Sequence, residues 1–73
     1  SKEMGKEGMY WLHTAAEQGS AKACWYLSLC YQLGTGTYAN YSKAKQWAHE
    51  AARRGSREAI EFIEDMNKKG INY

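Results

Sequence analysis

The sequence predicts an all-α fold, an α/α superhelix (solenoid) of antiparallel helix pairs with about two 36-residue repeats. The decapeptide WLHTAAEQGS, which begins at Trp11, returns as WAHEAARRGS from Trp47, and six of its ten positions are identical. Apolar residues recur at helical spacing and hardly ever alternate as in a strand. A period of this length is typical of solenoids, in which a helix pair buries its apolar face against neighbouring copies.

The first two predicted helices cover residues 2–18 and 21–33. The Gly-Ser pair at 19–20 separates them, because glycine suits the left-handed exit of one helix and serine caps the start of the next. Each helix carries apolar residues at helical spacing: Trp11, Leu12, Ala15 and Ala16 in the first, and Ala23, Leu27, Cys30 and Tyr31 in the second. The segment GTGTYAN, which has two glycines, ends the second helix.

The last two predicted helices cover residues 41–54 and 57–69, and a second Gly-Ser pair at 55–56 separates them. Their apolar stripes consist of Ala44, Trp47, Ala48, Ala51 and Ala52 in the third helix, and Ala59, Phe62, Ile63 and Met66 in the fourth. The alanine pairs allow close approach of two helices, while the indoles of Trp11 and Trp47 are predicted to be structural wedges between layers.

Length and charge restrict the classes of function. The chain has 73 residues and reads as one repeat segment over 1–73, which we expect to be the C-terminal end or an excised piece of a longer array. A net charge of +2 with 25% charged residues argues against a nucleic-acid partner. No apolar run approaches the ~18 residues of a membrane span, so membrane insertion is not expected.

The two cysteines, Cys24 and Cys30, belong to one predicted helix. Six residues place them ~9 Å apart along its axis and on different sides, which is too far for a disulfide. Free thiols favour a reducing compartment, hence a cytoplasmic location, while a secretory or periplasmic one stays open. The alternative is that both cysteines are simply small residues that fill the core, as most such cysteines do.

Residues 21–56 resemble a complete Sel-one-like repeat, a relative of the tetratricopeptide repeat. The positions that match the family pattern are Ala23, Leu27, Tyr31, Gly34, Gly36, Lys43, Ala44, Trp47, Ala51, Ala52 and Gly55. The flanks resemble half-repeats, a preceding second helix and a following first helix. Ser28 stands where the family has glycine, and Asn67 stands at the tyrosine position of the last helix. No Gly-x-Gly loop follows Asn67, so the array is predicted to end there.

Residues with catalytic or metal-binding chemistry are few. His13 and His49 occupy the same repeat position and are expected on the outer surface, without further ligands at a recognisable metal spacing. Three arginines in RRGSR, from Arg53 to Arg57, suit a phosphate or an acidic side chain, with simple helix-end solvation as the alternative. No nucleophile and base are paired. We therefore expect neither catalysis nor a cofactor or metal.

The resemblance implies that the first helices of the repeats line a concave side on which such arrays bind partners. The predicted partner-binding residues are Lys22, Trp25, Tyr26, Leu29 and Gln32 on the second helix, with Glu61 and Asp65 on the fourth. Trp and Leu ringed by polar groups suit the centre of an interface. Packing of Trp25 against the adjacent helix is an equally open alternative.

These observations predict a non-catalytic scaffold or adaptor that binds a protein or peptide. A self-associating structural spacer is the second hypothesis, because fewer than three repeats seldom stand alone. A third follows from the resemblance only: some bacterial relatives are linked to hydrolase activities, although no residue set in this chain supports one.

Overall fold

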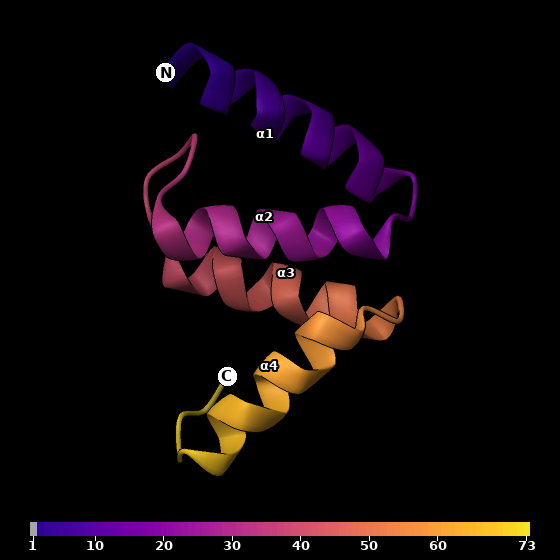
Figure 1. Ribbon diagram of the computed structural model, residues 1–73, viewed down its shortest axis with the longest axis vertical. Coiled ribbons are helices and arrows are strands. Elements are labelled where there is room, and N and C mark those ends of the chain that lie inside the picture. The colour runs from indigo at the N-terminus through magenta and orange to yellow at the C-terminus, as the bar shows by residue number, and fades with distance from the viewer. Residues whose placement is uncertain (1) are drawn as a thin grey trace.

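The computed structural model describes the backbone of residues 2–73 and the side chains of residues 5–73. Four helices follow one another: α1 (Lys2–Glu17), α2 (Ala21–Leu33), α3 (Tyr41–Arg53) and α4 (Arg57–Lys68). Figure 1 shows them stacked in chain order along the long axis, with α2 and α3 in the middle. The described residues form no strand, and the all-α helix-pair fold is confirmed. The predicted range 21–33 is identical to α2, and the other three extend one residue too far.

A polar side chain caps the start of each of the last three helices. The Ser20 Oγ, Asn40 Oδ1 and Ser56 Oγ atoms accept hydrogen bonds from backbone N–H groups three residues later, at 3.0, 3.0 and 3.2 Å. These bonds satisfy donors that the first helical turn leaves without a partner. The two Gly-Ser pairs therefore mark helix boundaries as predicted, because each serine caps the helix that follows it.

Replacing Ser56 with alanine is expected to destabilise the fold by about 1 kcal/mol, because the cap bond to the Ala59 N–H is lost at a buried site. Ser42→Ala is the matched control, since Ser42 is an exposed serine in the first turn of α3. Urea denaturation of both variants measures the difference. Equal midpoints for the two variants would contradict the capping role.

The contact between α2 and α3 is the centre of the core. Leu27 and Ser28 of α2 and three alanines of α3, Ala44, Ala48 and Ala51, are fully buried there. The Ser28 hydroxyl donates to the Ala44 carbonyl at 2.7 Å, and Gln32 Nε2 donates to Ser28 Oγ at 3.1 Å. Small alanine side chains permit close approach of the helices, and Ser28 adds a bond between them in place of the usual glycine.

The loop between α2 and α3 packs against α1 through two glycines. A Cβ atom on Gly36, whose φ is +74°, would lie 2.5 Å from the Gly5 carbonyl oxygen and 3.0 Å from the Met9 Cγ atom. Backbone therefore touches backbone where the loop crosses α1, and only glycine fits both the space and the left-handed conformation. This contact connects the first half-repeat to the complete repeat.

The prediction that Trp11 and Trp47 are both structural wedges is half wrong. Trp47 is partly buried against the core, with its ring centroid 5.5 Å from that of His13 on α1. Trp11 is 61% exposed and contacts the neighbouring Tyr10 ring at 5.3 Å. The reason is positional: Trp47 packs on the second helix of the preceding repeat, and no described residue supplies such a helix for Trp11.

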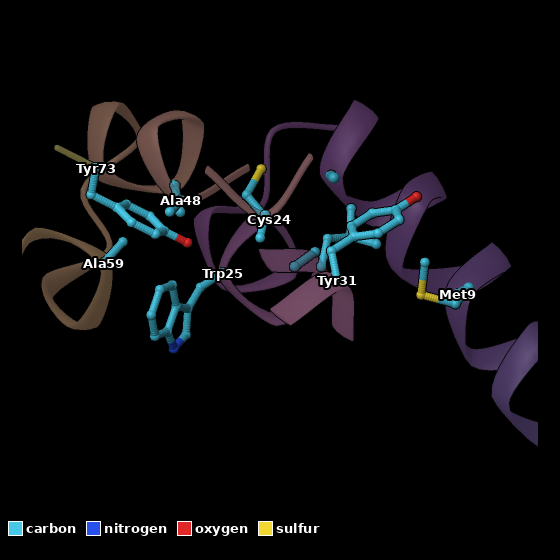
Figure 2. Close-up of a cluster of buried hydrophobic side chains, with 12 residues drawn as sticks. Met9, Cys24, Trp25, Tyr31, Ala48, Ala59 and Tyr73 are labelled. Atoms are coloured by element: carbon cyan, nitrogen blue, oxygen red, sulfur yellow. The ribbon is translucent and has the colours of Figure 1, made fainter. Parts of the chain in front are cut away.

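The C-terminal residues fold back into the core. The Tyr73 side chain is only 5% exposed, and its ring lies 4.8 Å from Phe62 and 5.4 Å from Tyr41. Figure 2 shows this ring beside Trp25, Ala48 and Ala59, at the opposite end of the buried cluster from Met9. Lys45 Nζ donates to the Asn72 carbonyl at 3.4 Å. Since Lys45 and Asn72 are the repeat equivalents of Met9 and Gly36, the tail follows the path of the earlier loop.

Candidate partner-binding face

The predicted binding residues of α2 divide into exposed and packed side chains. Lys22 and Tyr26 are exposed, and the Lys22 ammonium lies 5.9 Å from the centre of the Tyr26 ring. Leu29 is half-buried next to them. Gln32 is also half-buried, and its amide points to Ser28 of its own helix. Lys22 and Tyr26 therefore face solvent, with the half-buried Leu29 on the same helix side.

Trp25 packs against the adjacent helix α4, which was one of the two alternatives for this residue. Its side chain is 9% exposed, and its ring centroid lies 5.4 Å from that of Phe62 on α4. Figure 2 shows the indole directed to the side of the cluster that holds Tyr73 and Ala59. The predicted role of Trp25 as a contact for a partner is therefore corrected: the indole joins α2 to α4 and is not available on the surface.

Sequence reasoning missed Leu33, which is 75% exposed at the end of α2. Its position extends the series 22, 26, 29 by another four residues, so that it belongs to the same helix side. The α2 strip is defined here as Lys22, Tyr26, Leu29 and Leu33. The helical spacing itself was the signal for Leu33, but the prediction followed the spacing from Trp25 instead.

The two predicted acidic residues of α4 are exposed. Glu61 and Asp65 lie one turn apart, and Asp65 forms an ion pair with Lys69 at 3.1 Å between solvent-accessible side chains. Such a pair contributes little to stability in water. The Trp25–Phe62 contact connects α2 to α4, so the α2 strip and these carboxylates belong to the first helices of two successive repeats.

The two histidines are half-buried and each has a partner within the protein, whereas the sequence predicted free surface positions. His13 is half-buried, with its Nε2 atom 3.5 Å from the Tyr31 hydroxyl oxygen. His49 Nε2 lies 2.8 Å from the Tyr73 carbonyl oxygen, and the two rings of this pair are stacked. Asn67 occupies the position equivalent to Tyr31, and the tail supplies the partner of His49 in its place.

The arginine cluster is matched by an acid of its own helix. Arg53 and Arg54 both donate hydrogen bonds to the Glu50 carboxylate, and Arg54 Nε lies 2.7 Å from Glu50 Oε2. The hydrogen bond from Arg53 is the main cause that lowers the pKa of Glu50, and Arg54 adds to it. The cluster thus resembles a solvated helix end more than an open anion site.

The two cysteines are poorly suited to nucleophilic chemistry. Cys24 and Cys30 are free thiols, and burial raises the pKa of both, which disfavours the nucleophilic thiolate. The residues that the structure describes contain no group of three or more metal-ligating side chains. None of the described helices has the length and apolar character that a membrane crossing requires.

The fold and the exposed α2 strip define a helical-hairpin repeat protein whose first helices present side chains to solvent. The pattern of the Sel1 repeat matches residues 5–20 and 21–56, which together cover more than half of the chain. The chain therefore belongs to the Sel1 repeat family. Repeats of this family generally mediate protein–protein interactions.

A curated relative is chitin synthase regulatory factor 3 of Schizosaccharomyces pombe. It is 34% identical over 62 residues, which are 85% of this chain and 7% of the relative. The chain thus spans only a small part of that protein. No solved structure matches the chain.

Proposed function

We propose that the chain is a non-catalytic adaptor module that binds a protein or peptide on the first helices of its repeats. The observation that carries this proposal is the α2 strip. Its centre is Tyr26, 43% exposed, between the aliphatic Leu29 and Leu33 and the cationic Lys22. Tyrosine and leucine on a fixed helix supply apolar contact area at a small entropic cost, and a surface of this kind suits an interface.

The charges beside the strip give the partner a direction. Lys22 lies at the start of α2, whereas Glu61 and Asp65 lie on the adjoining α4. A bound segment is therefore expected to place an apolar residue on Tyr26, an acidic residue towards Lys22 and a basic residue towards α4. Charges at the edge of an interface mainly determine orientation and association rate.

The relative supports an adaptor more than an enzyme. Its name describes a regulatory factor, and regulation by a repeat module requires binding rather than catalysis. The hydrolase alternative therefore has no observation in its favour, and the self-association alternative concerns a different surface, at the two ends of the helix stack.

Replacing Tyr26 with aspartate is expected to weaken binding of a selected peptide at least ~10-fold, since a charge replaces the apolar centre of the strip. The peptide is first selected from a random library against the unmodified chain, and its affinity is then measured by fluorescence anisotropy. Tyr38→Asp is the matched control, because Tyr38 is a highly exposed tyrosine in the α2–α3 loop.

Circular dichroism of both variants checks that the helices are retained. If the selected peptides bind Tyr26→Asp as tightly as the unmodified chain, the α2 strip is not the binding face. Loss of binding in Tyr38→Asp as well would point to the loop as the site.

A further inference from the structure

The contact between the second helices of successive repeats has a characteristic composition. Trp47 of α3 packs edge-on against His13 of α1 with 5.5 Å between the ring centroids. Glu17 of α1 and Arg53 of α3 line the same surface hollow as Trp47. An indole on the later helix thus meets a histidine on the earlier one, and opposite charges flank them. We call this arrangement the indole–histidine contact.

One end of the chain exposes the indole half of an indole–histidine contact. Trp11 is the repeat equivalent of Trp47 and is 61% exposed on α1. The apolar side of α1, defined as Gly8, Leu12 and Ala15, is equivalent to Ala44, Ala48 and Ala51, which α2 buries completely. On α1 the same side is exposed at Gly8 and half-buried at the other two positions. No described helix covers it as α2 covers α3.

The other end of the chain presents the half-buried histidine of such a contact at a surface hollow. His49 is equivalent to His13 and lines a hollow of about 440 Å³ on α3, together with Ser42, Lys45, Gln46 and Arg53. The adjoining α4 is equivalent to α2, but its outer side is open. Ile60 is 39% exposed, whereas the equivalent Cys24 is fully buried. Figure 1 shows α1 and α4 at opposite ends of the stack.

We propose that two copies of this chain associate head to tail, with α1 of one copy docked on α3 and α4 of the other. Trp11 enters the hollow beside His49, as Trp47 packs on His13. The apolar side of α1 covers Ile60, as α3 covers Cys24. The contact between copies thereby continues the packing that already exists between the repeats of one chain.

Register and charge both fit this occupant. Two repeats of 36 residues span 72 positions, so that α1 of the second copy takes the position of a second helix paired with α4. Glu17 of the second copy then lies close to Arg53 of the first. Within one chain the acid is on the earlier helix and the base on the later one; between copies the base is on the earlier helix and the acid on the later one. Complementary charges favour this orientation over a symmetric pairing of two α1 helices.

One residue limits the strength of the association. Ser28 donates its hydroxyl to the Ala44 carbonyl, and the equivalent pair between copies is Glu64 with Gly8. An ionised carboxylate is an acceptor only and cannot donate to that carbonyl. We therefore expect reversible association at high protein concentration, and tighter association of Glu64→Ser, which restores the hydroxyl donor of the internal interface.

Sedimentation equilibrium over a concentration series tests the proposal. The average mass of the unmodified chain is expected to rise past about twice the 8.3 kDa monomer, because a head-to-tail contact does not close on itself. Glu64→Ser is expected to reach the same mass at lower concentration. Trp11→Asp and Ile60→Asp each block one end, and each is expected to remain a monomer alone. Tyr38→Asp is the control and should behave as the unmodified chain.

The decisive sample is the mixture of the two blocked variants. The free α1 of Ile60→Asp fits the free α3–α4 end of Trp11→Asp, so the mixture is expected to form dimers and nothing larger. Blocked variants that remain helical by circular dichroism but do not combine would overturn the head-to-tail arrangement. So would a mass that stops at the dimer, as in a symmetric pair, or a Glu64→Ser chain that stays monomeric throughout. None of these results depends on the α2 strip, so they leave the proposed adaptor function untouched.

Discussion

Gly36→Ala is expected to destabilise the protein by about 3 kcal/mol or more, enough to unfold a large fraction of a small domain. Two costs combine. The left-handed conformation, with φ at +74°, costs an alanine ~1–2 kcal/mol. The new methyl group would also lie 2.5 Å from the Gly5 carbonyl oxygen, and forcing apart a packed contact of this kind costs a further ~1–3 kcal/mol.

Gly55→Ala separates the two costs. Gly55 has a similar positive φ of +97°, but a Cβ atom there would meet no atom within 4 Å. Only the conformational cost of ~1–2 kcal/mol applies to this variant. Urea denaturation gives both free energies of unfolding. A loss at Gly36 no larger than that at Gly55 would show that the loop does not press on α1, and the link between half-repeat and repeat would then need another explanation.

The helix positions could be predicted because their causes are local. A capping serine and the glycine before it act within one turn of the chain, so Ser20 and Ser56 mark their helices whatever lies around them. The repeat adds a second signal, since equivalent positions of a solenoid carry similar residues and form equivalent helices. The bounds of α1, α3 and α4 differ from the prediction only where their last turns end.

The burial of the tryptophans could not be predicted from the same pattern. Trp11 and Trp47 are equivalent in sequence, yet one is exposed and the other packed, because the neighbour that such a tryptophan packs on belongs to the preceding repeat. Trp25 is buried by Phe62, which lies 37 residues later. Periodicity shows which side of a helix is apolar, but the identity of the helix that covers this side is a property of the assembled stack.

The role of the tail has the same physical origin. The segment after Gly70 lacks the Gly-x-Gly pattern, so no sequence signal indicated a loop in that place. Tyr73 nevertheless enters the core beside Phe62, and its carbonyl takes the His49 bond that a tyrosine takes in the first repeat. In the complete repeat, the positions equivalent to Tyr73 and Asn67 hold Thr37 and Tyr31. The large ring of Tyr73 therefore fills space in the last repeat that Asn67 leaves open.

Trp25→Ala is the second change for which we expect a large effect, a loss of ~3–5 kcal/mol in the free energy of unfolding. The indole fills the space between α2 and α4, in contact with Phe62, and its removal leaves a cavity in the cluster that also holds Tyr73. Since α4 packs mainly on α3 and would lose its contact with α2, hydrogen exchange of the α4 amides is expected to accelerate more than that of α2.

Trp11→Ala is the matched control, because it removes the same side chain from an exposed site. Its expected cost in dilute solution, below the concentration at which copies would associate, is within about 0.5 kcal/mol. Equal losses from the two truncations would mean that Trp25 does not join the repeats. If Trp25→Ala lowers the free energy of unfolding strongly but the α4 amides exchange no faster relative to those of α2, the indole stabilises α2 alone. The expected pattern, a large loss with α4 released first, requires the indole to hold successive first helices together, which is also the condition for α2 and α4 to present one continuous binding face.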